Sequence, residues 1–119
     1  MSIEWIEKDA KVLRHRIHGK MSESDMTEAQ QALVVAVGKF GRVRGLVILD
    51  DFEGWEDSEK WGDLTFQQEH DREIERIAVV GEERWRDEIL AFLVAPFRSA
   101  DVRYFGEHEL DRANDFIAE

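Results

Sequence analysis

Hydrophobic and polar residues alternate in two short stretches near the start of the chain. Residues 3–6 and 12–18 show this period of two, and the polar segment 7–11 separates them. A period of two is typical of strands that bury one face. The pattern therefore predicts two strands that form a hairpin.

A helical period follows the second strand. Ser22 and Asp25 have the three-residue spacing of a capping box, and apolar residues then recur at helical spacing up to Phe40. Gly38 or Gly41 is suited to ending this helix, because glycine readily adopts the left-handed conformation found at helix ends. The sequence predicts a first helix over this region.

Three later apolar stretches are predicted to be strands. The unbroken run Leu46–Leu49 is typical of a strand covered on both faces, and Ile77–Gly81 and Val102–Phe105 follow it along the chain. Helices are predicted between and after them, over residues 58–72, from 82 to near 96, and over 107–118.

The resulting order is ββαβαβαβα. Strands that alternate with helices need crossover connections, which give parallel pairs, and the opening hairpin adds an antiparallel edge. No linker, repeat or low-complexity segment divides the chain. We therefore expect a single α/β domain over residues 1–119, with a mixed, mostly parallel sheet of about five strands and helices packed on it.

The charge of the chain is acidic and unevenly distributed. The chain has 27 acidic and 16 basic residues, a formal net charge of −11. Residues 50–75 alone hold 11 acidic and 2 basic residues. This charge opposes binding to nucleic acid and to anionic lipid surfaces, so we expect basic or uncharged partners. The sequence has neither a membrane-span pattern nor a signal-peptide pattern, which favours a cytoplasmic location.

The usual catalytic motifs are absent from the sequence. There is no cysteine, no serine stands in a nucleophile elbow, and no glycine-rich phosphate loop occurs. His15 and His18 are three residues apart on a predicted strand, so they point to opposite faces and cannot share a metal ion. His15 is expected on the core side. We predict that the protein is not an enzyme and holds no cofactor or metal.

The acidic segment after Leu49 allows other interpretations. Adjacent carboxylates at a strand end could hold Mg²⁺ or accept a phosphoryl group, as in a receiver domain. That arrangement requires the acidic pair after the first strand and a lysine after the last, and neither is present. A calcium loop fails as well, because Leu49 would occupy its first ligand position. A solvated acidic loop is favoured.

Two tryptophans lie inside this acidic stretch. Trp55 and Trp61 could fold back over the edge of the sheet, or they could belong to a hydrophobic cleft or partner surface together with Phe52 and Phe66. Trp85, in contrast, begins an apolar helical stripe and is expected in the core.

Several motifs resemble those of the bacterial SpoIIAA-like proteins. These motifs are Gly19-Lys20-Met21, Leu49-Asp50-Asp51-Phe52-Glu53-Gly54-Trp55, Ile77-Ala78-Val79-Val80-Gly81-Glu82, Ala95-Pro96-Phe97 and Val102-Arg103-Tyr104-Phe105. The resemblance covers nearly the whole chain. It implies a fold similar to STAS domains, the class of the anti-sigma factor antagonists, and to the CRAL-TRIO lipid-binding domain.

The resemblance includes one departure from the phosphorylated antagonists. In those proteins a serine follows an aspartate just after the central strand. Here Phe52 follows Asp51, and a phenyl ring cannot accept phosphate. Glu53 supplies one negative charge nearby, less than phosphoserine carries.

These observations predict a non-catalytic bacterial STAS-like module. Its function is expected to be regulatory protein interaction without a phosphoserine switch, with a partner that carries a basic patch; the alternative is a carrier or sensor of an apolar small molecule or lipid. A homodimer is left open. The predicted ligand or partner surface comprises Asp50, Asp51, Phe52, Glu53, Trp55, Trp61 and Phe66.

Overall fold

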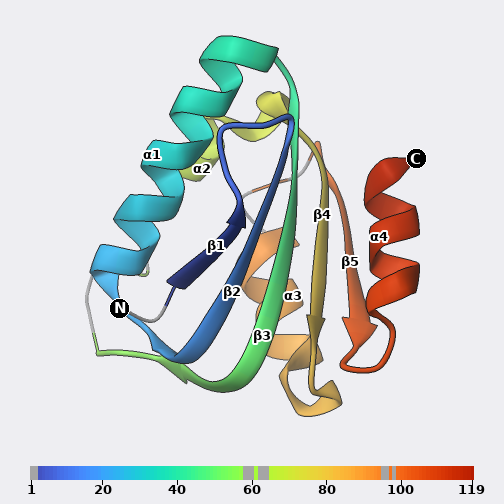
Figure 1. Ribbon diagram of the computed structural model, residues 1–119. Coiled ribbons are helices and arrows are strands. Elements are labelled where there is room, and N and C mark those ends of the chain that lie inside the picture. Colours follow the sequence, from blue (N-terminus) through green and yellow to red (C-terminus); the bar gives the residue numbers. More distant parts are fainter. Residues whose placement is uncertain (1–2, 58–60, 62–64, 95–96, 98) are drawn as a thin grey trace.

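A five-stranded sheet forms the centre of the computed structural model, which describes residues 3–57, 61, 65–94, 97 and 99–119. The strands are β1 (Ile3–Glu7), β2 (Val12–Met21), β3 (Val43–Trp55), β4 (Ile74–Gly81) and β5 (Asp101–Gly106). They lie side by side in sequence order, as Figure 1 shows. β1 is antiparallel to β2, and all other neighbours are parallel. The predicted mixed, mostly parallel sheet is confirmed.

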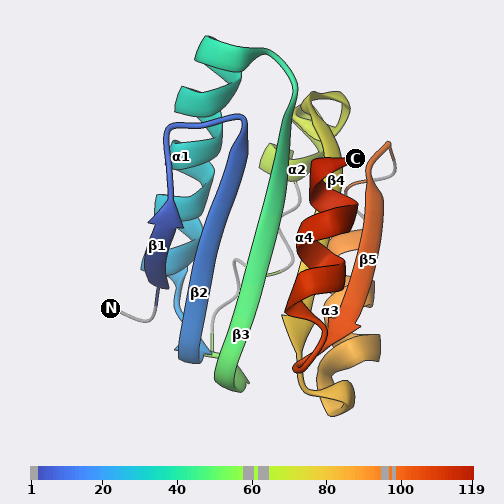
Figure 2. The ribbon, with the colours of Figure 1, turned by 45° about the vertical axis from the view of Figure 1, so that its right-hand side comes forward.

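Helices cover both faces of this sheet. The described helices are α1 (Glu23–Phe40), α2 (Thr65–Glu69), α3 (Arg86–Val94) and α4 (Leu110–Ala118), with two 3₁₀ turns, η2 (Asp71–Glu73) and η3 (Glu83–Trp85). In Figures 1 and 2, α1, α2 and α3 lie on one face, while α4 lies on the other over β4 and β5. The protein is a single α/β domain with two separate apolar layers.

The period of two in β3 explains how the two layers are filled. Val43 and Leu49 belong to the apolar cluster under α1 and α3, whereas Leu46 belongs to the cluster under α4. All three side chains are buried. Because successive side chains in a strand point to opposite faces, one apolar run supplies both layers.

The start of α1 follows the predicted capping chemistry. The backbone N–H of Asp25 donates to Ser22 Oγ over 3.1 Å, and the backbone N–H of Ser22 donates to Asp25 Oδ2 over 2.9 Å. Each bond satisfies a donor that the first turn leaves without a partner. The helix ends at Gly41, which has a φ of 77°.

α4 is held by two arginines from the sheet. Arg44 Nη1 of β3 donates to the carbonyl of Ile117 over 2.9 Å, and Arg76 Nη1 of β4 donates to the carbonyl of Phe116 over 2.9 Å. These carbonyls belong to the last turn of α4, where the helix supplies no partner of its own. The C-terminal end of α4 is therefore capped by neighbouring strands.

The predicted loop after Leu49 is wrong, because β3 continues to Trp55. Its pairing with β2 shifts between His18 and Lys20, and Asp51 in this segment has a positive φ of 51°. Such bulges allow a strand to continue through polar residues while its register is adjusted. As a result Phe52 turns into the core, where it is 1% exposed.

The helix boundaries differ from the predictions at three places. Within residues 58–72, the described part holds Trp61 in a 3₁₀ conformation, the short helix α2 and the start of η2; residues 58–60 and 62–64 lie outside the described residues. The helix predicted from residue 82 begins as η3 and becomes α-helical at Arg86, and the last helix begins at Leu110. None of these differences moves a strand.

Candidate functional site

An apolar cavity of about 170 Å³ lies between the sheet and the three helices α1, α2 and α3. A single water needs roughly 10–15 Å³ measured in this way, so the space is much larger than a packing defect. We call it the apolar cavity. Side chains that surround it include those of Leu13, Ile17, Met26, Leu33, Val47, Phe52, Ile77, Phe92, Leu93 and Phe97.

Gly45 of β3 contributes to this space. The residue lines the cavity between Val43 and Val47, which face the same side of the sheet. A Cβ added at Gly45 would meet no atom within 4 Å. Glycine weakens a strand interior and often marks a place where something else approaches the backbone. The missing side chain here leaves room on the floor of the cavity.

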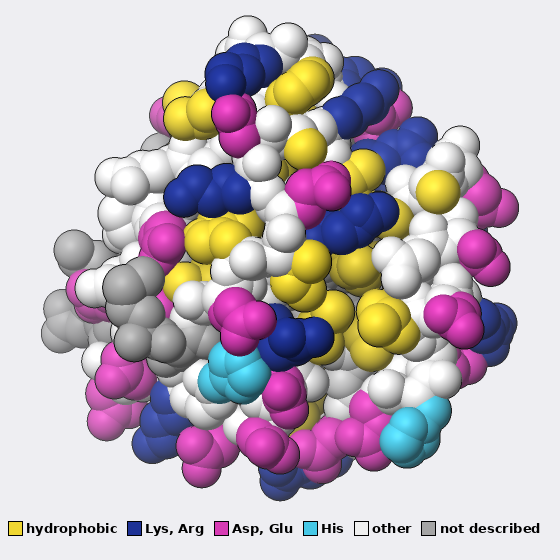
Figure 3. All heavy atoms as spheres, in the orientation of Figure 1, with side chains coloured by type: hydrophobic (Ala, Val, Ile, Leu, Met, Phe, Trp, Pro, Cys, Tyr) yellow, Lys and Arg dark blue, Asp and Glu magenta, His cyan; other side chains and the backbone are white. Residues whose placement is uncertain are grey.

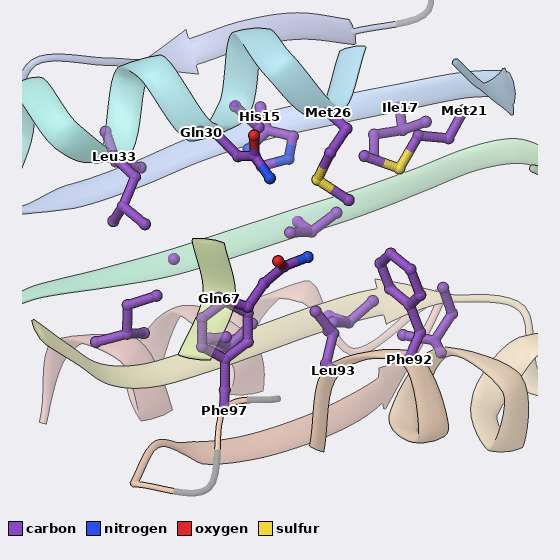
Figure 4. Close-up of a pocket in the computed structure, with 18 of the residues that line it drawn as sticks. His15, Ile17, Met21, Met26, Gln30, Leu33, Gln67, Phe92, Leu93 and Phe97 are labelled. Carbon is purple, nitrogen blue, oxygen red and sulfur yellow. The ribbon is translucent and has the colours of Figure 1, made fainter. Parts of the chain in front are cut away.

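A few polar atoms face this apolar space without a hydrogen-bond partner. Within the described residues, His15 Nδ1, Trp55 Nε1 and Gln67 Oε1 are buried and lack a partner. All three residues line the apolar cavity, together with Gln30. Figure 4 shows Gln30 and Gln67 directed into the cavity from opposite sides, with the ring of His15 beside Gln30. Polar groups of this kind fix the orientation of ligands in apolar pockets.

The imidazole of His15 is uncharged near neutral pH. Burial lowers the pKa of His15 to about 4, because an imidazolium loses its hydration in this environment. The ring also packs on Trp5, with 4.9 Å between the ring centroids. His15 lies on the core side, as predicted, and it presents a neutral polar group to the cavity.

A second hollow of about 140 Å³ adjoins the apolar cavity between α1 and α2. Glu23, Thr27 and Trp61 line only this outer hollow. The residues that line both spaces are Met26, Gln30, Phe66, Gln67 and Phe92. We call the boundary formed by these five residues the neck. Trp61 is fixed at the outer hollow, since its Nε1 donates to the carbonyl of Glu56 over 2.6 Å.

The structure divides the predicted surface into two groups. Phe52, Trp55 and Phe66 line the apolar cavity, and Trp61 lines the outer hollow. In contrast, the acidic residues Asp50, Asp51 and Glu53 of β3 are exposed. The residues of the predicted surface are therefore not one surface, because alternate side chains of β3 point to opposite faces of the sheet.

The acidic group lies at the carboxyl ends of the strands. Figure 3 shows acidic side chains gathered along the lower edge of the molecule, where Figure 1 places these strand ends. Asp50 Oδ2 lies 3.4 Å from Nδ1 of His18, and Glu4 Oε2 lies 3.3 Å from Nε2 of the same ring. His18 thus points away from the cavity, opposite to His15, as the strand period requires.

Phe52 and Trp55 pack with Trp85 and Phe92 as one aromatic cluster beside the cavity. Phe52 contacts Trp85 edge to face at a centroid distance of 4.9 Å and Trp55 at 5.3 Å. Trp55 also contacts Phe92 of α3 at 5.2 Å. Such arrangements add stability beyond the buried area. Phe52, Trp55 and Phe92 of this cluster line the apolar cavity.

Sequence reasoning missed Gly45, Gln30 and Gln67. A glycine two positions from a valine on either side, as Gly45 is from Val43 and Val47, is a usable signal for a space beside the sheet. The two glutamines gave no such signal, because surface helices commonly carry glutamine. Their importance follows from the way α1 and α2 meet over the sheet.

Two further observations concern metal and membrane. In the described part of the chain, His, Asp and Glu side chains form no group of three that could hold a metal ion. Among the helices that the structure describes, each is too short or too polar to cross a membrane.

Comparison with known proteins identifies the fold. An uncharacterized protein from Shewanella loihica with a SpoIIAA-like fold superimposes with a TM-score of 0.71 at 19% sequence identity; the match covers 98% of this chain and 94% of that chain. No curated protein matches the sequence. The family model described as SpoIIAA-like matches residues 12–118. With the strand order and the layers described above, this match shows that the chain belongs to the SpoIIAA-like family.

Proposed function

We propose that this protein binds a small, mainly apolar molecule in the apolar cavity and acts as its carrier or sensor, without catalysing a reaction. The observation that carries the proposal is the cavity itself, about 170 Å³ of space walled mostly by apolar side chains. An engineered apolar cavity of about 150 Å³ in another protein binds benzene, so a space of this size can hold a small apolar ligand.

The local structure supports this proposal over a simple packing fault. A side chain at Gly45 would have room to enter the space, because nothing lies within 4 Å of an added Cβ there. Cavities in protein cores cost stability in proportion to their volume. A glycine on the floor of such a space fits a protein that gives up some stability for a binding site.

The test uses toluene as a probe and fills the cavity by substitution. We expect toluene to bind saturably, with NMR shift changes at amides around the cavity. Gly45→Leu should abolish this binding and leave the protein folded. Gly38→Leu is the matched control, since Gly38 of α1 also has no atom within 4 Å of an added Cβ but is exposed to solvent.

Two results would contradict the proposal. The first is wild-type protein that shows no saturable toluene binding up to the solubility limit of the probe. The second is undiminished binding in folded Gly45→Leu, which would place the probe elsewhere. Native mass spectrometry of the purified protein adds a direct search for a retained molecule.

A second candidate function is supported by the exposed carboxylates. We propose that a protein partner with a basic patch docks at the strand ends, where the exposed acidic residues are Asp50, Asp51, Glu53, Glu56 and Asp57. Such docking would be sensitive to salt. Phosphorylation would not regulate it at residue 52, because Phe52 has no hydroxyl and is 1% exposed. Asp50→Asn with Asp51→Asn should weaken binding of a lysine-rich probe peptide, whereas Asp101→Asn should not.

A further inference from the structure

Gln67 is a buried amide with an unsatisfied acceptor. Its residue is 7% exposed, and its Oε1 has no partner among the described residues. Leaving a buried polar group without a hydrogen bond is costly, so native structures rarely keep one without a reason. Gln67 points into the apolar cavity from α2 (Figure 4). A donor group from a bound molecule would supply the missing hydrogen bond.

Gln30 faces Gln67 across the neck. Both side chains line the apolar cavity and the outer hollow, and Figure 4 shows them directed toward the same space. Each carboxamide offers N–H donors and a carbonyl acceptor, and neither carries a charge. A hydroxyl has the matching properties, since it donates one hydrogen bond and accepts others. The pair is therefore suited to a hydroxyl held at the boundary of the two spaces.

The lining of the apolar cavity disfavours a charged head group. It contains no acidic side chain, and Arg44 is its single basic residue among those described. The Arg44 guanidinium is engaged on the α4 side of the sheet, where it bonds the carbonyl of Ile117 and lies 3.6 Å from Glu75. His15 is neutral at physiological pH, because burial lowers its pKa to about 4. Inside the apolar cavity, a carboxylate or an ammonium ion would be buried without a counter-charge, which is costly. The acidic residue Glu23 lines only the outer hollow.

We propose that the molecule bound in this cavity is an uncharged alcohol, whose hydroxyl exchanges hydrogen bonds with Gln67 and Gln30 at the neck while its apolar part fills the cavity. The inference rests on the proposed function, since it specifies the ligand class of the same site. It assigns Gln67 and Gln30 as the residues that determine specificity. His15 Nδ1 and Trp55 Nε1 offer further polar contacts to a ligand with a second polar atom.

The test compares three probes that share one chain and differ in the head group: 1-octanol, octanoate and octylammonium. Calorimetric titration at neutral pH should show 1-octanol binding at least about tenfold more tightly than either ion, because burial of an unpaired charge is unfavourable. Toluene serves as the reference probe without a polar group.

Substitution at the neck then tests the residues. Gln67→Leu removes the amide at nearly constant size and should weaken 1-octanol binding about fivefold, the value of one net hydrogen bond. It should leave toluene binding unchanged or stronger. Gln68→Leu is the matched control, because Gln68 is the next residue of α2 and is exposed. Denaturant melts establish that each variant is folded, and if Gln67→Leu is not, Gln30→Leu should show the same selective loss.

The outcomes separate the two proposals. If no probe binds, toluene included, the proposed function fails. If toluene binds but 1-octanol is no better than octanoate, only the alcohol inference is overturned. Equal 1-octanol affinity in wild-type protein and folded Gln67→Leu or Gln30→Leu would also overturn it, because the amides would then have no part in recognition.

Discussion

The two faces of the sheet are packed in different ways. Under α4, the side chains of Ala78, Ala113 and Ile117 are completely buried, and small residues allow the helix to approach β3 and β4 closely. Under α1, α2 and α3, larger apolar side chains surround a cavity. The same strands build both faces. The difference shows that the space on one side is local to that layer and does not reflect a generally loose fold.

Two leucines of β3 provide the most direct test of this comparison. Leu46→Ala, under α4, should cost about 4 kcal/mol of unfolding free energy, because the close-packed layer cannot collapse around the lost atoms. Leu49→Ala, on the cavity side, should cost about 2 kcal/mol, since part of the Leu49 side chain already borders empty space. Urea melts of both variants measure the difference. Equal costs would indicate that the two layers are packed alike.

The unfolding free energy should depend on pH because His15 is buried on the cavity side of the sheet. Its pKa is lowered from 6.5 to about 4 in the folded protein because burial disfavours the charged ring. Between these values the unfolded chain binds more protons, so the unfolding free energy falls as the pH is lowered through this window. The contribution is complete above 6.5, and its full loss corresponds to about 3 kcal/mol.

His15→Phe isolates this contribution, because the substitution removes the titrating group and keeps a ring in place. Denaturant melts from pH ~7.5 to ~4.5 should show a smaller loss of stability in the variant than in the wild-type protein. Parallel curves for the two proteins would mean that His15 does not titrate differently on folding.

Gly45 and Gly81 both lie on the cavity side of the sheet, and alanine substitution at each compares free space with close packing within that layer. Gly45→Ala should raise the unfolding free energy by about 0.5–1 kcal/mol, because alanine costs less backbone entropy and its Cβ meets nothing. Gly81→Ala should lower it by about 1–3 kcal/mol, since its Cβ would lie 2.7 Å from the Tyr104 hydroxyl and 3.0 Å from Leu49. Thermal melts would show the opposite signs. A destabilising Gly45→Ala would argue against free space beside β3.

The sequence predicts the strands, and the order of strands and helices along the chain, because the apolar periods of these segments are strong. The run at Leu46 and the capping pair Ser22 and Asp25 each indicate one element, and the structure confirms both. The continuation of β3 to Trp55 was not predictable from local pattern, because it depends on pairing with β2 through bulges. Acidic residues on the exposed face of a bulged strand resemble a loop when only the sequence is considered.

The candidate site was predictable only in part for a related reason. Phe52, Trp55 and Phe66 were identified as a possible cleft, and they line the cavity. The empty volume itself depends on how α1, α2 and the sheet fit together, which no local pattern encodes. Gln67 becomes notable only when its burial and its missing partner are known.

The arginine caps of α4 have a consequence for the order in which the protein folds. Arg44 and Ile117 are 73 residues apart in sequence, and Arg76 and Phe116 are 40 apart. The last turn of α4 therefore gains its hydrogen-bond partners only after β3 and β4 have come together. A short helix of this kind is marginal alone. Its amides should consequently become protected from hydrogen exchange late in refolding, after those of β3 and β4.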